Sequence, residues 1–270
     1  MSTSDSPTYE SLISYLEPYT RAAIAFSGGV DSTFLLHAAR DALGKDNVLA
    51  MTINSPYIPD WELAEAEALA KRLQVKQITV NSGIPEPIRN NPKDRCYLCK
   101  TFIFNMLKEV AKSHGFDHVM DGTNAEDSED DRPGMKALKE LNIISPLKET
   151  GFTKKEILHY SKNKDLPTWE KPAYACLLTR LPYDRLIETE ELRRIEKSEK
   201  YLIDLGIRAV RVRSHGNLAR IETNRDNITR IFQENLFEKI ARQLKRYGYQ
   251  YVTLDLEGYR SGSYKEIFYK

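Results

Sequence analysis

The chain has 270 residues, of which 41% are hydrophobic and 29% are charged, and its formal net charge is +1 at pH 7. This composition is typical of a globular protein, and the small net charge excludes a general attraction to nucleic acids or membranes. The polar N-terminus excludes a signal peptide, and no apolar run approaches the about 20 residues of a membrane helix. The three cysteines are too few for a disulfide scaffold. We therefore expect a cytoplasmic protein.

The first half of the chain alternates predicted strands and helices. Apolar strands are expected at 22–26, 48–53, 76–80 and 118–120, and helices at 32–43, 60–73 and 96–113. This alternation predicts a parallel sheet with helices on both faces. In such folds, nucleotide sites lie at the carboxyl ends of the strands.

The loop after the first strand is the most informative segment. In chain order it consists of Ser27, Gly28, Gly29, Val30, Asp31 and Ser32. Glycines let the backbone approach a ligand closely, the unpaired N–H groups at a helix start attract anions, and the two serine hydroxyls add donors. Plain turns also use paired glycines, but the whole pattern predicts binding of nucleotide phosphates.

Asp31 distinguishes this loop from a Walker loop, which ends in Lys followed by Ser or Thr. A carboxylate beside phosphates is repelled unless a cation lies between them. We therefore expect Asp31 either to hold Mg²⁺ or to turn away from the anion.

Polar residues also follow other strands of the predicted sheet. Asn54 comes after the second strand, and Gly122 and Thr123 come after the fourth, so we expect them near the same nucleotide. The acidic segment 126–131 reads as a solvated loop, of which one carboxylate helps to hold Mg²⁺.

The pattern changes in the second half of the chain. A helix is expected at 152–163 and an irregular connection at 164–175, followed by a helix at 188–205, strands at 208–213 and 218–222, a helix at 236–247 and a strand at 251–254. We predict two domains, residues 1–175 with the nucleotide site and residues 176–270 as a small α+β domain.

Three cysteines leave three interpretations open. Cys96 and Cys99 share one face at a helix start, where thiol pKa values are lowered, whereas Cys176 lies far along the chain. The thiols are small buried hydrophobes, or the first two are a redox pair, or all three converge on one metal or iron–sulfur centre. Three thiolates with an open position suit a [4Fe–4S] cluster better than zinc, which normally takes four protein ligands.

Several basic side chains are candidates for anion binding. Arg211 and Arg213 lie on one face of a predicted strand, with valines on the other. Arginine suits bidentate phosphate binding, although a solvated strand face is the alternative, and Arg220 with Glu222 reads as a surface ion pair. Lys100 is either a partner for the leaving AMP or pyrophosphate, or a solvated helix residue.

The motifs together resemble the LarE family, PP-loop ATP-dependent sulfur insertases of nickel-pincer nucleotide (lactate racemase cofactor) synthesis. The residues that carry the resemblance are the loop at 27–32, Arg-Cys-Tyr-Leu-Cys-Lys at 95–100, Asp-Gly-Thr-Asn at 121–124, Asp-Arg-Pro-Gly at 131–134, Pro-Ala-Tyr-Ala-Cys-Leu at 172–177, Arg-Val-Arg at 211–213 and the segment 256–263. This resemblance implies an α/β fold of the adenine nucleotide alpha-hydrolase-like type, the PP-loop ATP pyrophosphatase fold.

The resemblance also implies the chemistry. ATP adenylates the carboxylates of pyridinium-3,5-biscarboxylic acid mononucleotide, pyrophosphate leaves, and sulfur converts each acyl adenylate into a thiocarboxylate. Members with one cysteine, at the position of Cys176, give up their own sulfur and end as dehydroalanine. Members with three are thought to hold a [4Fe–4S] cluster, here with Cys96, Cys99 and Cys176 as ligands, and we favour that route. At position 178 many relatives carry a small residue, whereas this chain has Leu178.

Other functions are compatible with the loop. A PP-loop tRNA thiolase is the first alternative, but it requires a phosphate-tracking surface that the net charge does not suggest. An amide synthetase would leave the cysteines without a role, and a non-catalytic AMP sensor would not release pyrophosphate. As partners we expect ATP and the pyridinium mononucleotide, no nucleic acid and no membrane, and we expect a homo-oligomer.

Overall fold

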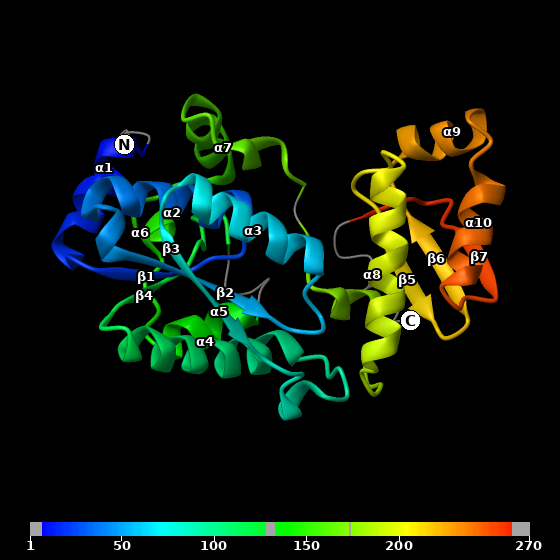
Figure 1. Cartoon of the computed structure of the whole chain (residues 1–270), viewed down its shortest axis with the longest axis horizontal. Helices are drawn as coiled ribbons and strands as arrows, with labels where there is room; N and C mark the ends of the chain where they lie inside the picture. Colours follow the sequence, from blue (N-terminus) through cyan, green and yellow to red (C-terminus); the bar gives the residue numbers. More distant parts are fainter. Residues whose placement is uncertain (1–6, 128–132, 173, 261–270) are drawn as a thin grey trace, which may run out of the picture. The chain divides into compact units, whose positions relative to one another are not determined.

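The computed structural model describes residues 7–127, 133–172 and 174–260 (Figure 1). The chain forms two compact units, one made of Met1–Ile88 and Asp94–Ala173 and the other of Arg89–Lys93 and Tyr174–Lys270. The predicted change of domain lay after residue 175, and the sequence did not indicate that the short segment Arg89–Lys93 goes with the second unit. Each unit has a sheet of its own.

The first unit contains a four-stranded sheet in the order β3-β2-β1-β4. Its strands are β1 (Ala22–Ala25), β2 (Val48–Asn54), β3 (Lys76–Asn81) and β4 (Val119–Met120). All three pairings are parallel, so the carboxyl ends of the strands meet at one edge of the sheet. The predicted α/β class with a parallel sheet is confirmed.

Seven α-helices are described in the first unit, four of them close to predicted ranges. They are α1 (Tyr9–Leu16), α2 (Val30–Leu43), α3 (Asp60–Arg72), α4 (Arg95–Ser113), α5 (Gly134–Glu140), α6 (Pro146–Glu149) and α7 (Lys154–Asn163). Short 3₁₀ turns are η1 (Glu17–Tyr19), η2 (Lys45–Asn47), η3 (Glu86–Ile88) and η4 (Pro167–Glu170). The sequence analysis did not predict α1, α5 and α6.

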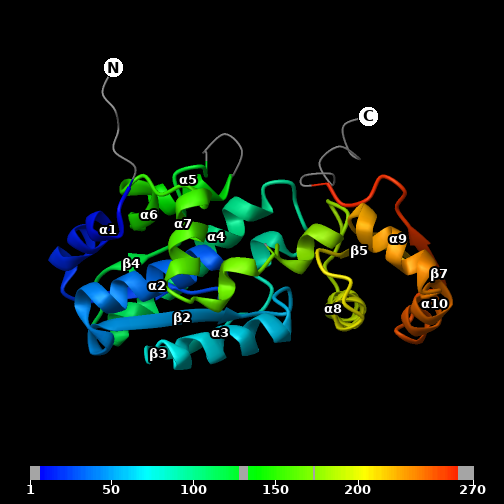
Figure 2. The same cartoon turned by 90° about the horizontal axis from the view of Figure 1, so that it is seen from above.

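Helices cover both faces of this sheet, with α2 and α3 on one side and α4 and α5 on the other (Figure 1). Side chains alternate along a strand, so β1 contributes to both layers. Ala22 and Ile24 belong to the hydrophobic cluster under α1, α2, α3 and α7, whereas Ala23 belongs to the cluster under α4 and α5. α7 lies beside α2 (Figure 2). The rings of Phe34 on α2 and Tyr160 on α7 stack with their centroids 6.1 Å apart.

The second unit is a small α+β domain. It contains η5 (Leu177–Arg180), α8 (Thr189–Asp204), β5 (Arg211–His215), β6 (Leu218–Glu222), α9 (Arg225–Gln233), α10 (Phe237–Arg246) and β7 (Tyr251–Leu254). The sheet order is β5-β6-β7, with β5 antiparallel and β7 parallel to β6. Its core includes the fully buried Leu202, Val212 and Leu244.

Two features of the second unit differ from the sequence prediction. β5 begins at Arg211 rather than at residue 208, because Ala209 has a φ of 52°, which interrupts an extended strand. α9 was not predicted, since it buries only Ile231. In the part of the chain that the structure describes, no helix combines the length and apolar character needed to cross a membrane.

Candidate active site

The phosphate-binding turn predicted from the sequence joins β1 to α2. Gly28 has a φ of 68°, in the left-handed region that glycine adopts without strain. A Cβ added to Gly28 would lie 3.1 Å from the Cα of Ala66 on α3, so the turn also approaches that helix closely. Gly29 is the N-cap of α2 and makes no side-chain cap hydrogen bond. The turn therefore has a geometry compatible with an anion at the start of α2, and phosphate binding there stays a prediction.

The two serines of the turn bond within it. The hydroxyl oxygens of Ser27 and Ser32 are 3.2 Å apart, the Gly29 N–H donates to Ser27 Oγ at 3.3 Å, and Ser32 Oγ donates to the Gly29 carbonyl at 3.2 Å. Ser32 is buried, as is Val30. These contacts hold the loop in shape, and donation from the hydroxyls to a phosphate stays a prediction.

Residues after β4 lie against this turn, as expected for neighbouring parallel strands. A Cβ added to Gly122 would be 2.8 Å from the backbone nitrogen of Ser32, so only glycine fits without displacing the loop. Thr123 Oγ1 donates to Asp121 Oδ2 at 2.5 Å, and Ser145 Oγ donates to Asp121 Oδ1 at 2.6 Å. The buried Asp121 thus holds together the segment that carries Gly122.

The other predicted strand-end residues have local partners. Asn54 Nδ2 donates to Asn81 Oδ1 at 2.8 Å, which ties the ends of β2 and β3 together. In the acidic segment, Asp127 Oδ2 accepts the N–H of Asn124 at 3.1 Å. The acidic residues at 129–131 lie outside the described residues, as do the family-motif residues Arg132 and 261–263.

Two lysines that the sequence analysis did not single out lie at the phosphate-binding turn. Lys154 Nζ is 2.9 Å from both carboxylate oxygens of Asp31. Lys171 Nζ donates to the Gly28 carbonyl at 3.0 Å and pairs with Glu65 at 2.7 Å. Nothing in the local sequence marks these lysines, since each is one of several in a polar segment.

Cys96 lies in the first turn of α4, and Cys99 is the fifth residue of that helix. Cys96 is exposed and Cys99 is half-buried, and Cys99 Sγ is 3.3 Å from the hydroxyl oxygen of Tyr57. Both are in the first unit, whereas Cys176 belongs to the second. Among the described residues, no group of three or more His, Cys, Asp and Glu side chains is arranged to hold a metal ion.

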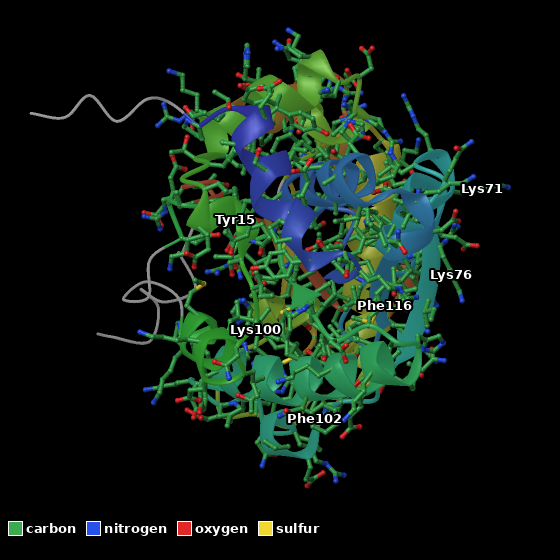
Figure 3. All side chains as sticks on the ribbon, turned by 90° about the vertical axis from the view of Figure 1, so that its left-hand side faces the viewer. Tyr15, Lys71, Lys76, Lys100, Phe102 and Phe116 are labelled. Carbon is green, nitrogen blue, oxygen red and sulfur yellow. The ribbon has the colours of Figure 1, made fainter. Side chains whose placement is uncertain are left out.

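Lys100 follows Cys99 on α4 and points to the side of that helix opposite Phe102 (Figure 3). A Cβ added to Gly134 at the start of α5 would lie 2.6 Å from Cδ of Lys100. The stem of Lys100 therefore packs against the backbone of α5, as long basic side chains often do. Its role toward AMP or pyrophosphate stays a prediction.

Cys176 directly precedes the turn η5, and a buried ion pair holds that turn. Arg180 Nη1 donates to the carbonyl oxygens of Ala175 and Cys176, at 2.6 and 3.1 Å. The other guanidinium nitrogens of Arg180 bind both carboxylate oxygens of Glu199, at 2.9 and 2.8 Å. The side chains of this pair are only 1% and 0% exposed, so the backbone at Cys176 is fixed from inside the domain.

Arg211 and Arg213 are buried rather than solvated. Arg213 forms a two-point ion pair with Glu222, at 3.0 and 2.9 Å. The guanidinium of Arg211 lies 5.4 and 5.0 Å from the ring centres of Tyr174 and Tyr259. The pKa of Arg211 is lowered, chiefly by burial and to a smaller extent by the nearby positive charge of Arg180. Both arginines share one side of β5, as predicted.

The ion pair suggested for Arg220 and Glu222 is present, but the expectation that it lies at the surface was wrong for Glu222. The two side chains do pair, at 3.0 Å, but Glu222 is 1% exposed. Glu222 also pairs with Arg213, and two guanidinium groups offset part of the free-energy cost of burying its carboxylate.

Comparisons with known proteins extend along the whole chain. Residues 12–94 match the NAD synthase family. The chain is 36% identical over 261 residues to the pyridinium-3,5-bisthiocarboxylic acid mononucleotide synthase of Lactiplantibacillus plantarum, covering 96% of this chain and 94% of that protein. An uncharacterized protein of Synechocystis sp. is 39% identical over 263 residues, covering 97% and 98% of the two chains. Another, from Methanocaldococcus jannaschii, is 38% identical over 240 residues, covering 88% and 90%.

The family suggested by the sequence motifs is confirmed by these matches, which run through both units rather than through the phosphate-binding turn alone. The chain therefore belongs to the LarE family, together with the pyridinium-3,5-bisthiocarboxylic acid mononucleotide synthase.

Proposed function

We propose that this protein is an ATP-dependent sulfur transferase that converts the carboxylates of pyridinium-3,5-biscarboxylic acid mononucleotide into thiocarboxylates. The observation that carries the proposal is the end-to-end similarity to the named synthase. The turn at Gly28 supports it, because its geometry is suited to an anion at the start of α2. A tRNA thiolase is not favoured, since a relative that spans the chain is named as the synthase of a mononucleotide.

The first half of the reaction is adenylation. A substrate carboxylate oxygen attacks the α-phosphorus of ATP, the bond from that phosphorus to the bridging oxygen breaks, and pyrophosphate leaves with the electron pair. The N–H groups at the start of α2 hold the departing anion. Gly28 and Gly122 keep side chains out of the space around the turn.

Magnesium fits this turn. Asp31 is the second residue of α2, its side chain is 26% exposed, and carboxylate oxygen is a preferred ligand of Mg²⁺. Mg²⁺ commonly takes one or two carboxylates and completes its shell with phosphates and water, so Asp31 would suffice as the protein ligand. The ion would neutralise phosphate charge beside this carboxylate.

The second half of the reaction is sulfur transfer at Cys176. The carbonyl carbon of the acyl adenylate accepts sulfur, and AMP leaves as a good leaving group. The ion pair of Arg180 and Glu199 fixes the backbone beside this thiol. We propose Arg211 and Arg213 for the substrate phosphate, and Arg213 also pairs with Glu222.

Two sulfur sources agree with the residues present. Cys96, Cys99 and Cys176 would supply three thiolates to a [4Fe–4S] cluster with one open iron, which would carry an external sulfide. Among the residues that the structure describes, no three such ligands lie together. The alternative source is the sulfur of Cys176 itself. Iron content after anaerobic reconstitution separates the two: about four iron atoms per chain support the cluster. Conversion of Cys176 to dehydroalanine after one turnover supports the sacrificial route.

The test of the proposed function is a substrate-dependent ATP–pyrophosphate exchange assay with the purified full chain. We expect exchange with pyridinium-3,5-biscarboxylic acid mononucleotide, and a product whose mass rises by one oxygen-to-sulfur replacement per carboxylate. Absence of both exchange and product in a folded, nucleotide-binding protein would contradict the proposal. The cytoplasmic location, the homo-oligomer and the absence of nucleic-acid binding stay predictions.

A further inference from the structure

Lys154 is the basic side chain that lies against the carboxylate of the phosphate-binding turn. α7 begins at Lys154, and its Nζ binds both oxygens of Asp31, at 2.9 Å each. The two side chains are 37% and 26% exposed, so a ligand in solution can reach both. The contact joins residues 123 positions apart, and it puts a positive charge beside a turn already suited to an anion.

Lys171 provides an internal comparison. Its ammonium group is committed to the Gly28 carbonyl and to Glu65, and its side chain is only 14% exposed. Lys171 therefore supports the backbone of the turn. Lys154 instead binds the carboxylate of Asp31, which would also hold Mg²⁺. A complex of Mg²⁺ and ATP would therefore compete with Lys154 for Asp31.

We propose that Lys154 is a phosphate-binding residue that exchanges Asp31 for the β- and γ-phosphates of ATP and stabilises the departing pyrophosphate. The inference rests on the proposed function and adds a residue to it. Asp31 in contact with a divalent cation no longer needs the ammonium group, and the flexible four-carbon stem of lysine lets that group turn to a nearby anion. A phosphate oxygen offers it a charge-assisted hydrogen bond.

The role belongs to one step of the reaction. When the bond between the α-phosphorus and the bridging oxygen breaks, the electron pair stays on pyrophosphate, whose negative charge grows. The Lys154 N–H groups donate to those oxygens while the substrate carboxylate forms its bond to the α-phosphorus. No proton is transferred, and the acyl adenylate and pyrophosphate are the only products of the step.

The experiment compares Lys154→Met with Lys155→Met in the full-length protein. Lys155 is the next residue and is exposed, so both substitutions remove one positive charge from the same helical turn and change the general field alike. Affinities for ATP, inorganic pyrophosphate and AMP are measured by titration calorimetry, with Mg²⁺ and in excess EDTA. We expect Lys154→Met to weaken ATP and pyrophosphate binding about tenfold to a hundredfold, and AMP binding by less than about twofold.

The arm with Mg²⁺ tests the contact, because the proposal has the cation release Lys154 from Asp31. A loss of pyrophosphate affinity in Lys154→Met with Mg²⁺ present supports the contact, and partial recovery in Lys154→Arg supports it further. Equal pyrophosphate affinity of the two methionine variants in the presence of Mg²⁺ overturns it. Lys154→Gln repeats the comparison if the methionine variant does not fold. If the unmodified protein binds neither ATP nor pyrophosphate, the proposed function itself fails, which is a different result.

Discussion

The turn at Gly28 and the turn at Cys176 lie in different units and are stabilised in different ways. The first is shaped by short contacts of its own backbone and hydroxyls and by the absence of side chains at Gly28 and Gly122. The second is held by the ion pair of Arg180 and Glu199, which is 1% and 0% exposed.

This difference suits the two tasks proposed for the turns. A phosphate-binding loop needs backbone N–H groups that a ligand can approach, so close packing of glycines is the suitable means of fixing it. A reactive thiol needs a fixed position, and buried charges fix it strongly because moving one of them leaves the other unpaired. The turn at Cys176 should therefore be more sensitive to single charge substitutions than the turn at Gly28 is to small steric changes.

The largest expected effect is in the second unit. Arg180→Met or Glu199→Met alone leaves an unpaired buried charge, which typically costs about 3–5 kcal/mol of stability, whereas the double substitution should recover much of that loss. Hydrogen exchange of α8 and β5 amides in the full chain measures it. Arg193→Met breaks an exposed ion pair with Glu190 and should cost less than about 1 kcal/mol. Equal losses at Arg180 and Arg193 would remove the contrast between the two turns.

A smaller effect is expected in the first unit. Gly28→Ala places a side chain on a residue with a φ of 68° and brings its Cβ to 3.1 Å from the Cα of Ala66. We expect a loss of about 1–3 kcal/mol, from backbone strain and overpacking, together with weaker ATP binding. Denaturant unfolding and calorimetry measure both quantities. Gly83→Ala is the control, because an added Cβ there meets nothing within 4 Å, and a Gly28→Ala variant as stable as this control would count against the steric account.

The smallest expected effect is a pH dependence in the first unit. Burial lowers the pKa of His37 below 6.5, although Asp41, whose carboxylate lies 3.5 Å away, opposes this change and Arg40 and Lys164 add to it. The unfolded chain therefore binds the proton first, and the free energy of unfolding should fall as the pH drops below about 6.5, by at most about 1.4 kcal/mol per pH unit. Unfolding measured between pH 7.5 and 5.5 tests this.

His37→Gln should flatten that pH dependence, whereas His159→Gln, at an exposed position on α7, should leave it unchanged. The same slope in His37→Gln and the unmodified protein would show that another group is responsible. Because His37 packs near Tyr9 and Asp41, the substitution also lowers stability at neutral pH, so the slopes and not the absolute values are compared.

Much of the fold could be predicted because its signals are local. The apolar runs of the parallel strands, the glycine turn before α2 and the strand β7 (Tyr251–Leu254) are all visible within a few neighbouring residues. α1, α5, α6 and α9 were missed: α6 has four residues, α5 has seven, and α9 buries only Ile231. Their helical state depends on the elements against which they pack.

In the candidate site, too, the features with local signals could be predicted and the long-range contacts could not. Ser27 to Ser32, the cysteine pair on α4 and the motif around Cys176 could be identified from residue type and spacing, and so could the family. The burial of Glu222, the pairing of Arg213 and the pairing of Arg180 with Glu199 could not, because each depends on residues brought together across strands or helices.

By itself, the amino-acid sequence determined the alternating α/β plan, the glycine turn before α2 and the three thiols of this protein, since local pattern and backbone sterics specify them. Only the tertiary structure decided which ion pairs form at these features: Lys154 with Asp31 at the glycine turn, and Arg180 with Glu199 beside Cys176. Local ion pairs follow from helical spacing, but these two join residues far apart in the chain, and only the folded backbone brings their side chains within a few ångströms.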